Sequence, residues 1–280
     1  MRIFIAGGSG VLGRALIPLL TAAGHDVTAT SRSADKISLI SRLGATPAVF
    51  DALDRDAVFR VVSEARPHVI MHLLTDLSSG DSSSNARLRV TGSRNLVDAA
   101  MCVGTHRVIA ESISWVYRPG ATPATEEEPL DADPAEPRRT TIAAVAALES
   151  SVRELPEHVV LRFGQLYGPG TWYSREGRFG RDARAGRLPA TDTVTSFIHT
   201  SDAARAAVLA LAWRSGSYNV VDDEPASGRE WVPGFATAVG APEPAVVRSG
   251  DIGRPVSNAR ARGGGLVLRH ASWRDGFASL

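Results

Sequence analysis

Short apolar runs alternate with stretches of helical periodicity through the first half of the chain. The apolar runs predict strands at Arg2–Ala6, Asp26–Ser31, Thr46–Phe50, Val69–Leu74, Arg107–Glu111 and His158–Phe163. The periodic stretches between them predict helices at Val11–Ala23, Ala34–Leu43, Asp54–Glu64, Ser84–Val103 and Thr140–Leu155. Strands that are apolar throughout are typical of a parallel sheet covered on both faces. The order of these elements therefore predicts an α/β fold with a doubly wound parallel sheet and right-handed crossovers.

A glycine-rich turn joins the first predicted strand to the first predicted helix. Glycine accepts positive φ and close backbone approach, and a helix start offers free N–H groups and a positive dipole end to a pyrophosphate. A strand before the turn and a helix after it are the context of a dinucleotide fingerprint, and the alternative is a ligand-free turn. This context makes the predicted sheet Rossmann-like. We predict cofactor contacts at Gly7, Ser9, Gly10, Val11, Leu12 and Gly13.

The end of the second predicted strand bears on the choice between NAD and NADP. An acidic residue there would bind the adenosine ribose and favour NAD, but the strand continues into Ser31 and Arg32. An arginine at this point can hold a 2′-phosphate, so we predict NADP, with NAD the less favoured cofactor. The alternative is that Arg32 is an ordinary solvated arginine.

Further cofactor contacts are expected beyond the carboxyl ends of the other strands, where doubly wound sheets bind ligands. Asp51 either accepts from an adenine amine or is a turn residue. His72 lies inside an apolar run, where a histidine is more often a satisfied core residue than a ligand. The remaining predicted contacts are Ala52, Leu73, Leu74, Thr75, Phe163 and Gly164.

The pattern changes after Phe163, where a turn-rich segment leads into aromatic and arginine side chains. Further elements are predicted at Val194–Ile198, Ser201–Trp213, Ser217–Val221 and Gly228–Val239. We predict a dinucleotide-binding domain over residues 1–165, with 193–225 returning to it, and a smaller C-terminal substrate lobe formed by 166–192 and 226–280. Four aromatic side chains either line a substrate pocket or pack the protein interior: Tyr117, Tyr167, Trp172 and Tyr173.

Composition narrows the set of partners. A net charge of +1 gives no broad basic field, so we expect neither a nucleic-acid nor an anionic-membrane partner. No apolar run approaches the length of a membrane span, and we expect no signal sequence, because Met1 and Arg2 lead directly into the predicted first strand. The single cysteine, Cys102, excludes an intramolecular disulfide and a multi-cysteine metal site. We expect a soluble cytoplasmic protein with no metal and a small-molecule substrate.

Several motifs together resemble the extended short-chain dehydrogenase/reductase family, the NAD(P)-dependent epimerase/dehydratase group. They are the glycine turn, Val69–Leu73, Thr91–Leu96, Val116-Tyr117, Leu161-Arg162, Tyr167–Gly170, Phe197–Asp202 and Tyr218–Val220. The resemblance spans nearly the whole chain. It implies a bound dinucleotide, a small-molecule substrate and, as in many relatives, a homodimer formed through the helices predicted at 84–103 and 140–155.

The chain departs from the resembled family at the catalytic pair. The family usually carries Tyr-x-x-x-Lys on the helix after the fifth strand, and a glutamate that usually follows aligns with Glu149. The tyrosine position is then Thr141 and the lysine position Val145, and Lys36 is the only lysine in the chain. The family's Ser/Thr position falls at Ile113, between Ser112 and Ser114, and its usual asparagine falls at Arg89.

Three functions remain open on these residues. The favoured one is an NADP-dependent oxidoreductase acting on a small metabolite, with its proton taken from elsewhere or not required. The second is a non-redox isomerase, dehydratase or cyclase, and the third a non-catalytic dinucleotide sensor. The candidate catalytic groups are Ser112, Ser114, Tyr117 and Thr141, with Glu111 or the substrate itself as further proton sources.

Overall fold

The computed structural model describes residues 1–76, 82–248 and 253–280. A seven-stranded sheet forms its centre, with the strand order β10-β6-β5-β4-β1-β2-β3. Its strands are β1 (Arg2–Ala6), β2 (Asp26–Ser31), β3 (Thr46–Val49), β4 (Val69–His72), β5 (Arg107–Ile113), β6 (Glu157–Phe163) and β10 (Gly216–Val220). The pairs β1·β2, β1·β4, β2·β3 and β4·β5 are parallel. The predicted doubly wound α/β architecture is confirmed.

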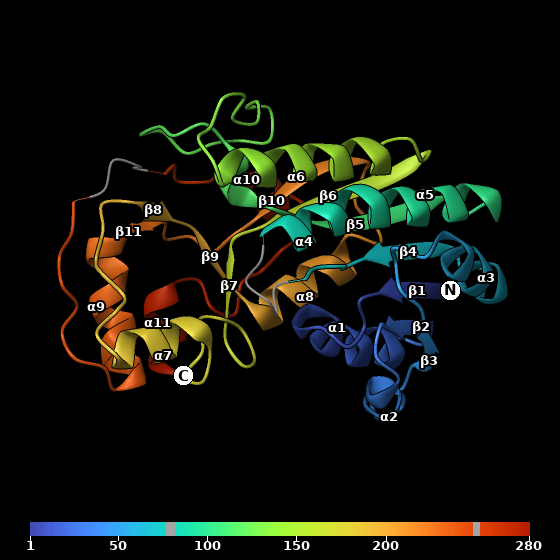
Figure 1. The fold of residues 1–280 in the computed structure, drawn as a ribbon, viewed down its shortest axis with the longest axis horizontal. Coiled ribbons are helices and arrows are strands. Elements are labelled where there is room, and N and C mark those ends of the chain that lie inside the picture. Colours follow the sequence, from blue (N-terminus) through green and yellow to red (C-terminus); the bar gives the residue numbers. More distant parts are fainter. Residues whose placement is uncertain (77–81, 249–252) are drawn as a thin grey trace. The chain divides into compact units, whose positions relative to one another are not determined.

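The helices between these strands also follow the predicted order. They are α1 (Val11–Ala22), η1 (Ala34–Lys36), α2 (Ile37–Arg42), α3 (Arg55–Ala65), α4 (Ser82–Arg87), η2 (Leu88–Gly92), α5 (Ser93–Cys102), η3 (Ser114–Val116) and α6 (Arg138–Val152). In Figure 1, α5 and α6 lie along one side of the sheet and α1 along the other. Both faces of the strands are thereby covered, which explains their continuously apolar sequences.

Strand alternation divides the buried side chains between the two faces of the sheet. Phe4 and Ala6 join Ile70, Val108 and Ala110 in one cluster. The cluster also includes α3 side chains such as Val62, α5 side chains such as Leu96 and α6 side chains such as Leu148. Residues next along the strands, such as Ile3 and Ile5, are equally buried and point to the opposite face.

The long helix predicted over Ser84–Val103 is instead three consecutive segments. Its middle segment, η2, is a π-helical turn between α4 and α5. A single π turn occupies only a few residues inside an otherwise helical stretch, so the helical periodicity of the sequence predicted one continuous helix. A methyl group on Gly92 would approach Leu88 Cδ1 to 2.9 Å, so the turn is tightly packed.

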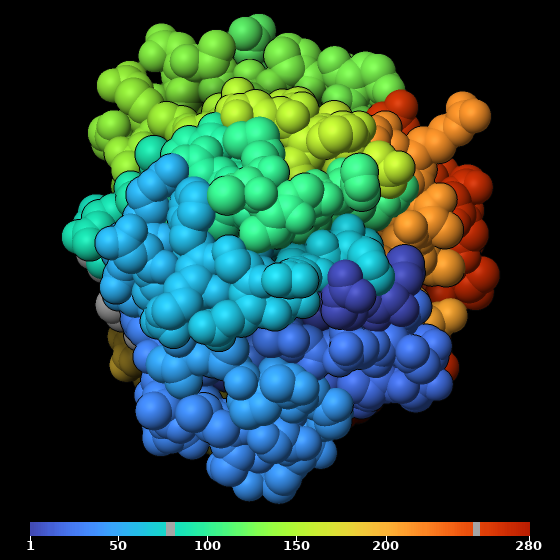
Figure 2. Space-filling view, turned by 90° about the vertical axis from the view of Figure 1, so that its right-hand side faces the viewer, coloured from blue at the N-terminus to red at the C-terminus, as the bar shows by residue number. Residues whose placement is uncertain are grey.

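The chain divides into two compact units. The first comprises Met1–Ser112, Asp133–Leu161 and Ala207–Ser217, and the second comprises Ile113–Ala132, Arg162–Ala206 and Tyr218–Leu280. The sequence-based division at residue 165, with 193–225 returning, differs from this contact-based one: of that returning segment, the contacts place only Ala207–Ser217 in the first unit. Figure 2 looks onto the blue and cyan segments of the first unit, which pack into a closed surface.

The second unit has its own smaller elements and its own core. Apart from the strand residues of the central sheet, its elements are β7 (Gln165–Tyr167), α7 (Arg178–Arg184), β8 (Val194–Thr195), β9 (Phe197–His199), β11 (Ala226–Ser227), α9 (Gly228–Val239), α10 (Ala259–Gly263) and α11 (Trp273–Ala278). Helix α8 (Thr200–Leu209) begins in this unit and ends in the first. Aromatic rings dominate the core, with Tyr167, Phe197 and Phe277 in edge-to-face contact.

The described residues offer neither a membrane-spanning helix nor a cluster of metal ligands. Within the described ranges, none of the helices has the length and apolar character that crossing a bilayer requires. The same part of the chain brings together no group of three or more side chains suited to holding a metal ion.

Candidate functional site

The turn between β1 and α1 requires glycine at two positions for reasons of packing alone. Gly7 has φ +97°, and a methyl group there would lie 2.4 Å from the Leu73 carbonyl oxygen. A methyl group on Gly13 would lie 2.6 Å from the Gly7 and Gly8 carbonyl oxygens. The turn, the end of β4 and the first turn of α1 therefore meet backbone to backbone, and these two glycines would be needed without any ligand.

Gly10 is less tightly packed than Gly7 and Gly13. It is exposed, its φ is −71°, and the nearest atom to an added methyl group would be the Gly7 carbonyl oxygen at 3.2 Å. Gly10 is also the N-cap of α1, and no side chain caps the helix there. The first N–H groups of α1, on Val11, Leu12 and Gly13, have no acceptor within the helix. An uncapped helix start beside an exposed glycine fits a dinucleotide pyrophosphate.

The end of β2 places its polar side chains beside this turn. Ser9 Oγ donates to Ser31 Oγ at 3.1 Å, and the Ser33 N–H donates to the same oxygen at 3.1 Å. The Arg32 side chain is 66% exposed, and its Nη1 lies 3.4 Å from the Asp76 carboxylate. A guanidinium is thus available at the predicted position, with an acidic side chain in contact with it.

The other predicted cofactor contacts of the first unit have definite structural surroundings. Asp51 Oδ1 accepts from the Leu53 N–H at 2.9 Å, which is the turn arrangement foreseen as one of its two roles. Ala52 is buried, and its carbonyl accepts from Asn95 Nδ2 at 2.9 Å. Beyond β4, Leu73 is buried, Leu74 is half-buried and Thr75 is exposed.

His72, at the end of β4, is a core residue. It is fully buried, and its Nε2 lies 2.7 Å from Ser93 Oγ. Burial, together with the nearby positive charge of Arg89, lowers the pKa of His72 to about 4. The imidazole is therefore neutral at physiological pH, in agreement with the sequence-based interpretation.

A contact between β5 and α6 shows which residues of this chain lie at the family's usual catalytic positions. Ser112 Oγ donates to the Glu149 carboxylate at 2.8 Å, and Arg153 Nη2 donates to the same carboxylate at 2.8 Å. Val145 lies one helical turn before Glu149 and is fully buried, and Thr141 lies one turn earlier and is half-buried. These two positions therefore hold a methyl-bearing side chain and an aliphatic hydroxyl, where a phenol and an ammonium group would stand in the family pattern.

Arg89 and Glu111 interact in the first unit. The sequence had indicated Glu111 only as a further proton source and had not singled out Arg89 as a catalytic candidate. Arg89 lies in the π turn η2 and is 6% exposed. Glu111 lies in β5 and is half-buried. Burial raises the pKa of Glu111 to about 7, although the positive charge of Arg89 opposes the shift, and burial likewise lowers the pKa of Arg89. The sequence signal for Arg89 was its place at the family's usual asparagine.

In the second unit, Tyr117 belongs to a buried hydrogen-bond network. Its hydroxyl accepts from Arg162 Nη1 at 2.7 Å and donates to Asn219 Oδ1 at 2.7 Å, and the side chain is 2% exposed. Burial raises the pKa of Tyr117. Ser114, in η3, is also buried. The predicted catalytic roles of both stay predictions, and for Tyr117 the network supplies a structural role.

The other aromatic candidates of the second unit lie in or against its core. Tyr167 and Tyr173 are buried, whereas Trp172 is half-buried and its ring lies 5.3 Å from the Arg178 guanidinium carbon. These positions support the packing alternative for the two tyrosines, and their role in a substrate pocket stays a prediction. Phe163 is buried in the same unit, and the Gly164 N–H donates to the Val220 carbonyl at 3.0 Å.

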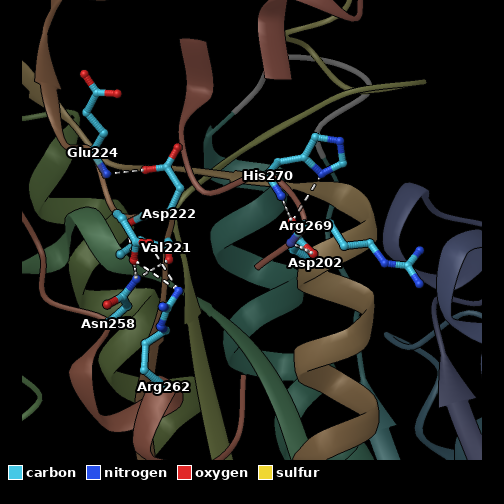
Figure 3. A network of polar contacts seen from close by, with 9 residues as sticks. Asp202, Val221, Asp222, Glu224, Asn258, Arg262, Arg269 and His270 are labelled. Carbon is cyan, nitrogen blue, oxygen red and sulfur yellow. Dashed lines mark hydrogen bonds and ion pairs between the residues drawn. The ribbon is translucent and has the colours of Figure 1, made fainter. Parts of the chain in front are cut away.

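Two sets of hydrogen bonds, one at Asp202 and one at Asn258, hold the C-terminal part of the second unit together (Figure 3). Asp202, at the start of α8, accepts from the Arg269 and His270 N–H groups at 3.0 and 2.9 Å. Asn258 Nδ2 donates to the Val221 and Asp222 carbonyls at 3.0 and 3.3 Å. Asp202 thus has a structural role, because it links the start of α8 to the segment around His270.

Comparisons with known proteins agree with this architecture. The model of the NAD dependent epimerase/dehydratase family matches residues 3–221. A 3-diazoavenalumate denitrifying reductase from a Streptomyces species is 38% identical, covering 99% of each chain. A 2-alkyl-3-oxoalkanoate reductase from Stenotrophomonas maltophilia is 29% identical, covering 86% of this chain and 77% of that one. A crystal structure of Thermus thermophilus UDP-glucose 4-epimerase with NAD has a TM-score of 0.81 and 24% identity, covering 99% and 97%. The chain belongs to the NAD dependent epimerase/dehydratase family.

Proposed function

We propose that the protein is an NADP(H)-dependent reductase of a small organic acid that carries a diazo group. The observation that carries the proposal is the exposed, uncapped start of α1 at Gly10, which an anion fits. Family membership supports a dinucleotide as that anion.

Two kinds of evidence favour reduction over epimerisation. A relative that is 38% identical over 99% of both chains is named a reductase, and so is one that is 29% identical. The positions of the family's acid and ammonium groups hold Thr141 and Val145. An aliphatic hydroxyl is a much weaker acid than a phenol. The chain therefore lacks the acid and base that family members usually use to oxidise a sugar hydroxyl or to reduce the resulting ketone.

The diazo class follows from the relative whose name includes both a diazo group and denitrification. Reductive loss of dinitrogen from a neutral diazo carbon consumes one hydride and one proton and replaces the C=N₂ group with CH₂. The bound reduced dinucleotide would supply the hydride. Because dinitrogen is an excellent leaving group, the enzyme need not stabilise an alkoxide, and the requirement for a paired phenol and ammonium disappears.

The chain's own residues would then hold the two reactants. The N–H groups at the start of α1 bind the pyrophosphate, and Gly10 lets it approach the backbone. Arg32 and Ser31 face the adenosine end, where a guanidinium favours the 2′-phosphate of NADP. The Asp76 carboxylate, 3.4 Å from Arg32, holds the guanidinium in place before the cofactor arrives and must yield it on binding.

The proposal is tested by mixing the purified protein with reduced cofactor and a diazo organic acid, and measuring reduced-cofactor absorbance and dinitrogen together. Equal molar loss of NADPH and release of dinitrogen is the expected result. Product formed without loss of NADPH would instead support a non-redox catalyst. Cofactor binding with no conversion of a panel of diazo acids would contradict the reductase.

A further inference from the structure

The register of the central sheet places Glu111 level with the dinucleotide turn. Ala6 in β1 pairs with His72 in β4, and His72 pairs with Ala110 in β5. The residues that follow these three are Gly7, Leu73 and Glu111. They therefore lie side by side in one row, one residue beyond the carboxyl end of β4. Neighbouring strands are about 4.8 Å apart, so the Glu111 backbone lies about 10 Å from the first glycine of the turn.

The other candidate proton sources are already engaged in hydrogen bonds or are poor acids. The Ser112 hydroxyl donates a hydrogen bond to the Glu149 carboxylate. Thr141 is an aliphatic alcohol, which is a weak acid. In the second unit the Tyr117 hydroxyl both donates to Asn219 and accepts from Arg162. Among the groups considered from the sequence, Glu111 is the one that combines an acidic proton with a place in this row.

Three titratable groups bear on the charge at Glu111, namely Arg89, His72 and Glu149, the last of which Ser112 contacts on the other face of β5. Arg89 lies in η2, whose π-helical form is frequent at functional sites. His72 in β4 is neutral, because burial lowers its pKa to about 4. Glu149 in α6 is occupied by Ser112 and Arg153. Of the described residues, Arg89 is the one whose charge acts on the Glu111 carboxyl.

We propose that Glu111 donates the proton that the diazo substrate needs, and that Arg89 is a positioning residue that sets when Glu111 holds that proton. This inference rests on the proposed reductase function. In the step, the Glu111 O–H bond breaks and its electron pair stays on the carboxylate. A C–H bond forms at the diazo carbon from this proton, and a bound reduced dinucleotide would supply the hydride that replaces dinitrogen, which leaves with the C–N bonding pair. Solvent then returns a proton to Glu111.

The balance of burial and charge suits this role. A general acid works best when its pKa is near the working pH. Burial raises the pKa of Glu111 to about 7, and the Arg89 charge keeps it from rising further. An acid poised in this way is half protonated near neutral pH and is restored by bulk water after each turnover.

The first arm of the test needs neither cofactor nor substrate. Glutamate labelled at the carboxyl carbon reports each titration by NMR in the ligand-free protein, and Glu111→Gln identifies the resonance by removing it. The expected midpoint is near pH 7, moving to higher pH in Arg89→Met and staying close to the wild-type value in Arg89→Lys. A midpoint near that of an exposed glutamate, or one that Arg89→Met leaves unchanged, would overturn the inference.

The second arm separates this inference from the proposed function. Wild-type consumption of NADPH with a diazo acid should fall as the pH rises above about 7, since the protonated form of Glu111 is lost. Glu111→Gln should reduce the rate by about 10²-fold or more while retaining NADPH affinity. Glu154→Gln, on the exposed end of a surface ion pair, is the matched control and should keep the wild-type rate. An inactive wild type contradicts the proposed function, whereas an active Glu111→Gln variant contradicts only the inference.

Discussion

Ser112 donates a 2.8 Å hydrogen bond to the buried carboxylate of Glu149 and thereby sets the register between β5 and α6. Both side chains are essentially inaccessible to water. The bond accounts for the serine hydroxyl structurally, and it fixes Val145 and Thr141 at the two positions where the family usually carries its lysine and tyrosine. The difference from the family's chemistry is therefore built into the packing of this helix.

Removal of the Ser112 hydroxyl should affect stability more than catalysis. Ser112→Ala leaves the Glu149 carboxylate with one fewer donor in a buried place, which should lower the free energy of unfolding by about 1–3 kcal/mol. Denaturant unfolding measures the change, with the exposed Ser41→Ala as control. If Ser112→Ala instead abolished NADPH consumption in a protein of near wild-type stability, Ser112 would be the proton donor.

Glycine substitutions should separate ligand binding from folding in the first turn. Gly10→Ala places its methyl group 3.2 Å from the Gly7 carbonyl oxygen and should destabilise the fold less than Gly13→Ala, yet it should weaken dinucleotide binding about tenfold, equal to about 1.4 kcal/mol. Gly13→Ala would press against two carbonyl oxygens and should lower the thermal midpoint of unfolding. Isothermal titration and thermal unfolding measure the two effects.

Gly263→Ala is the control for the glycine comparison, because nothing lies within 4 Å of its added methyl group. It should change neither binding nor stability by a large amount. Full-affinity binding of NADPH by a folded Gly10→Ala protein would show that the turn does not approach the pyrophosphate as proposed.

Arg32 and Asp76 should have opposite effects on the choice of cofactor. Arg32→Ala removes a charge-assisted contact to the 2′-phosphate and should weaken NADPH binding by about 1–3 kcal/mol while leaving NADH binding nearly unchanged. Asp76→Asn removes the carboxylate that competes for the guanidinium and should strengthen NADPH binding. Titration with both cofactors, with Arg42→Ala as control, checks the pair, and equal affinity of wild type for the two cofactors would refute the NADP assignment.

Asp222 should make the protein less stable as the pH rises. It is 1% exposed, its Oδ2 has no hydrogen-bond partner among the described residues, and burial raises its pKa to about 8. The folded state therefore holds a proton that the unfolded state releases near pH 4, so the free energy of unfolding falls between about pH 4 and pH 8. Asp222→Asn cannot ionise and should avoid this loss.

The Asp222→Asn variant should match wild type below about pH 4 and exceed it by about 2–5 kcal/mol above pH 8. Chemical unfolding across this pH range gives the comparison. The exposed Asp223→Asn change should show no such growing difference, although it removes an ion pair with Arg262. A constant gap between wild type and Asp222→Asn would mean that Asp222 is ionised throughout.

The sequence predicted the strands of the sheet to within a residue or two, because each is a short apolar run that ends in polar or turn residues. Thr46–Phe50, for example, was predicted where the structure has Thr46–Val49. The turn at Gly7, Gly10 and Gly13 was equally visible. The sequence could not show which of these glycines is packed most tightly, since that depends on the Leu73 and Gly8 carbonyls brought near by the fold.

Other features depend on contacts between distant residues and leave little trace in the sequence. The π turn at Leu88–Gly92 is a short segment inside a stretch of helical pattern, so it was predicted as part of a continuous helix. Tyr167 and Tyr173 lie in loop-like sequence, as pocket residues often do, yet they pack in an aromatic core. The electrostatic interaction between Arg89 and Glu111 joins a residue of the π turn to a residue of β5, which are far apart in the sequence.

The most direct test of the reductase account follows a deuterium atom from the transferable position of reduced NADP to the product. The account predicts one deuterium on the carbon that carried the diazo group, one equivalent of dinitrogen and one of oxidised cofactor. In heavy water with unlabelled cofactor, the proton donated by the enzyme should supply a single deuterium at the same carbon. A product that carries no label from the cofactor would contradict hydride transfer and with it the proposed function.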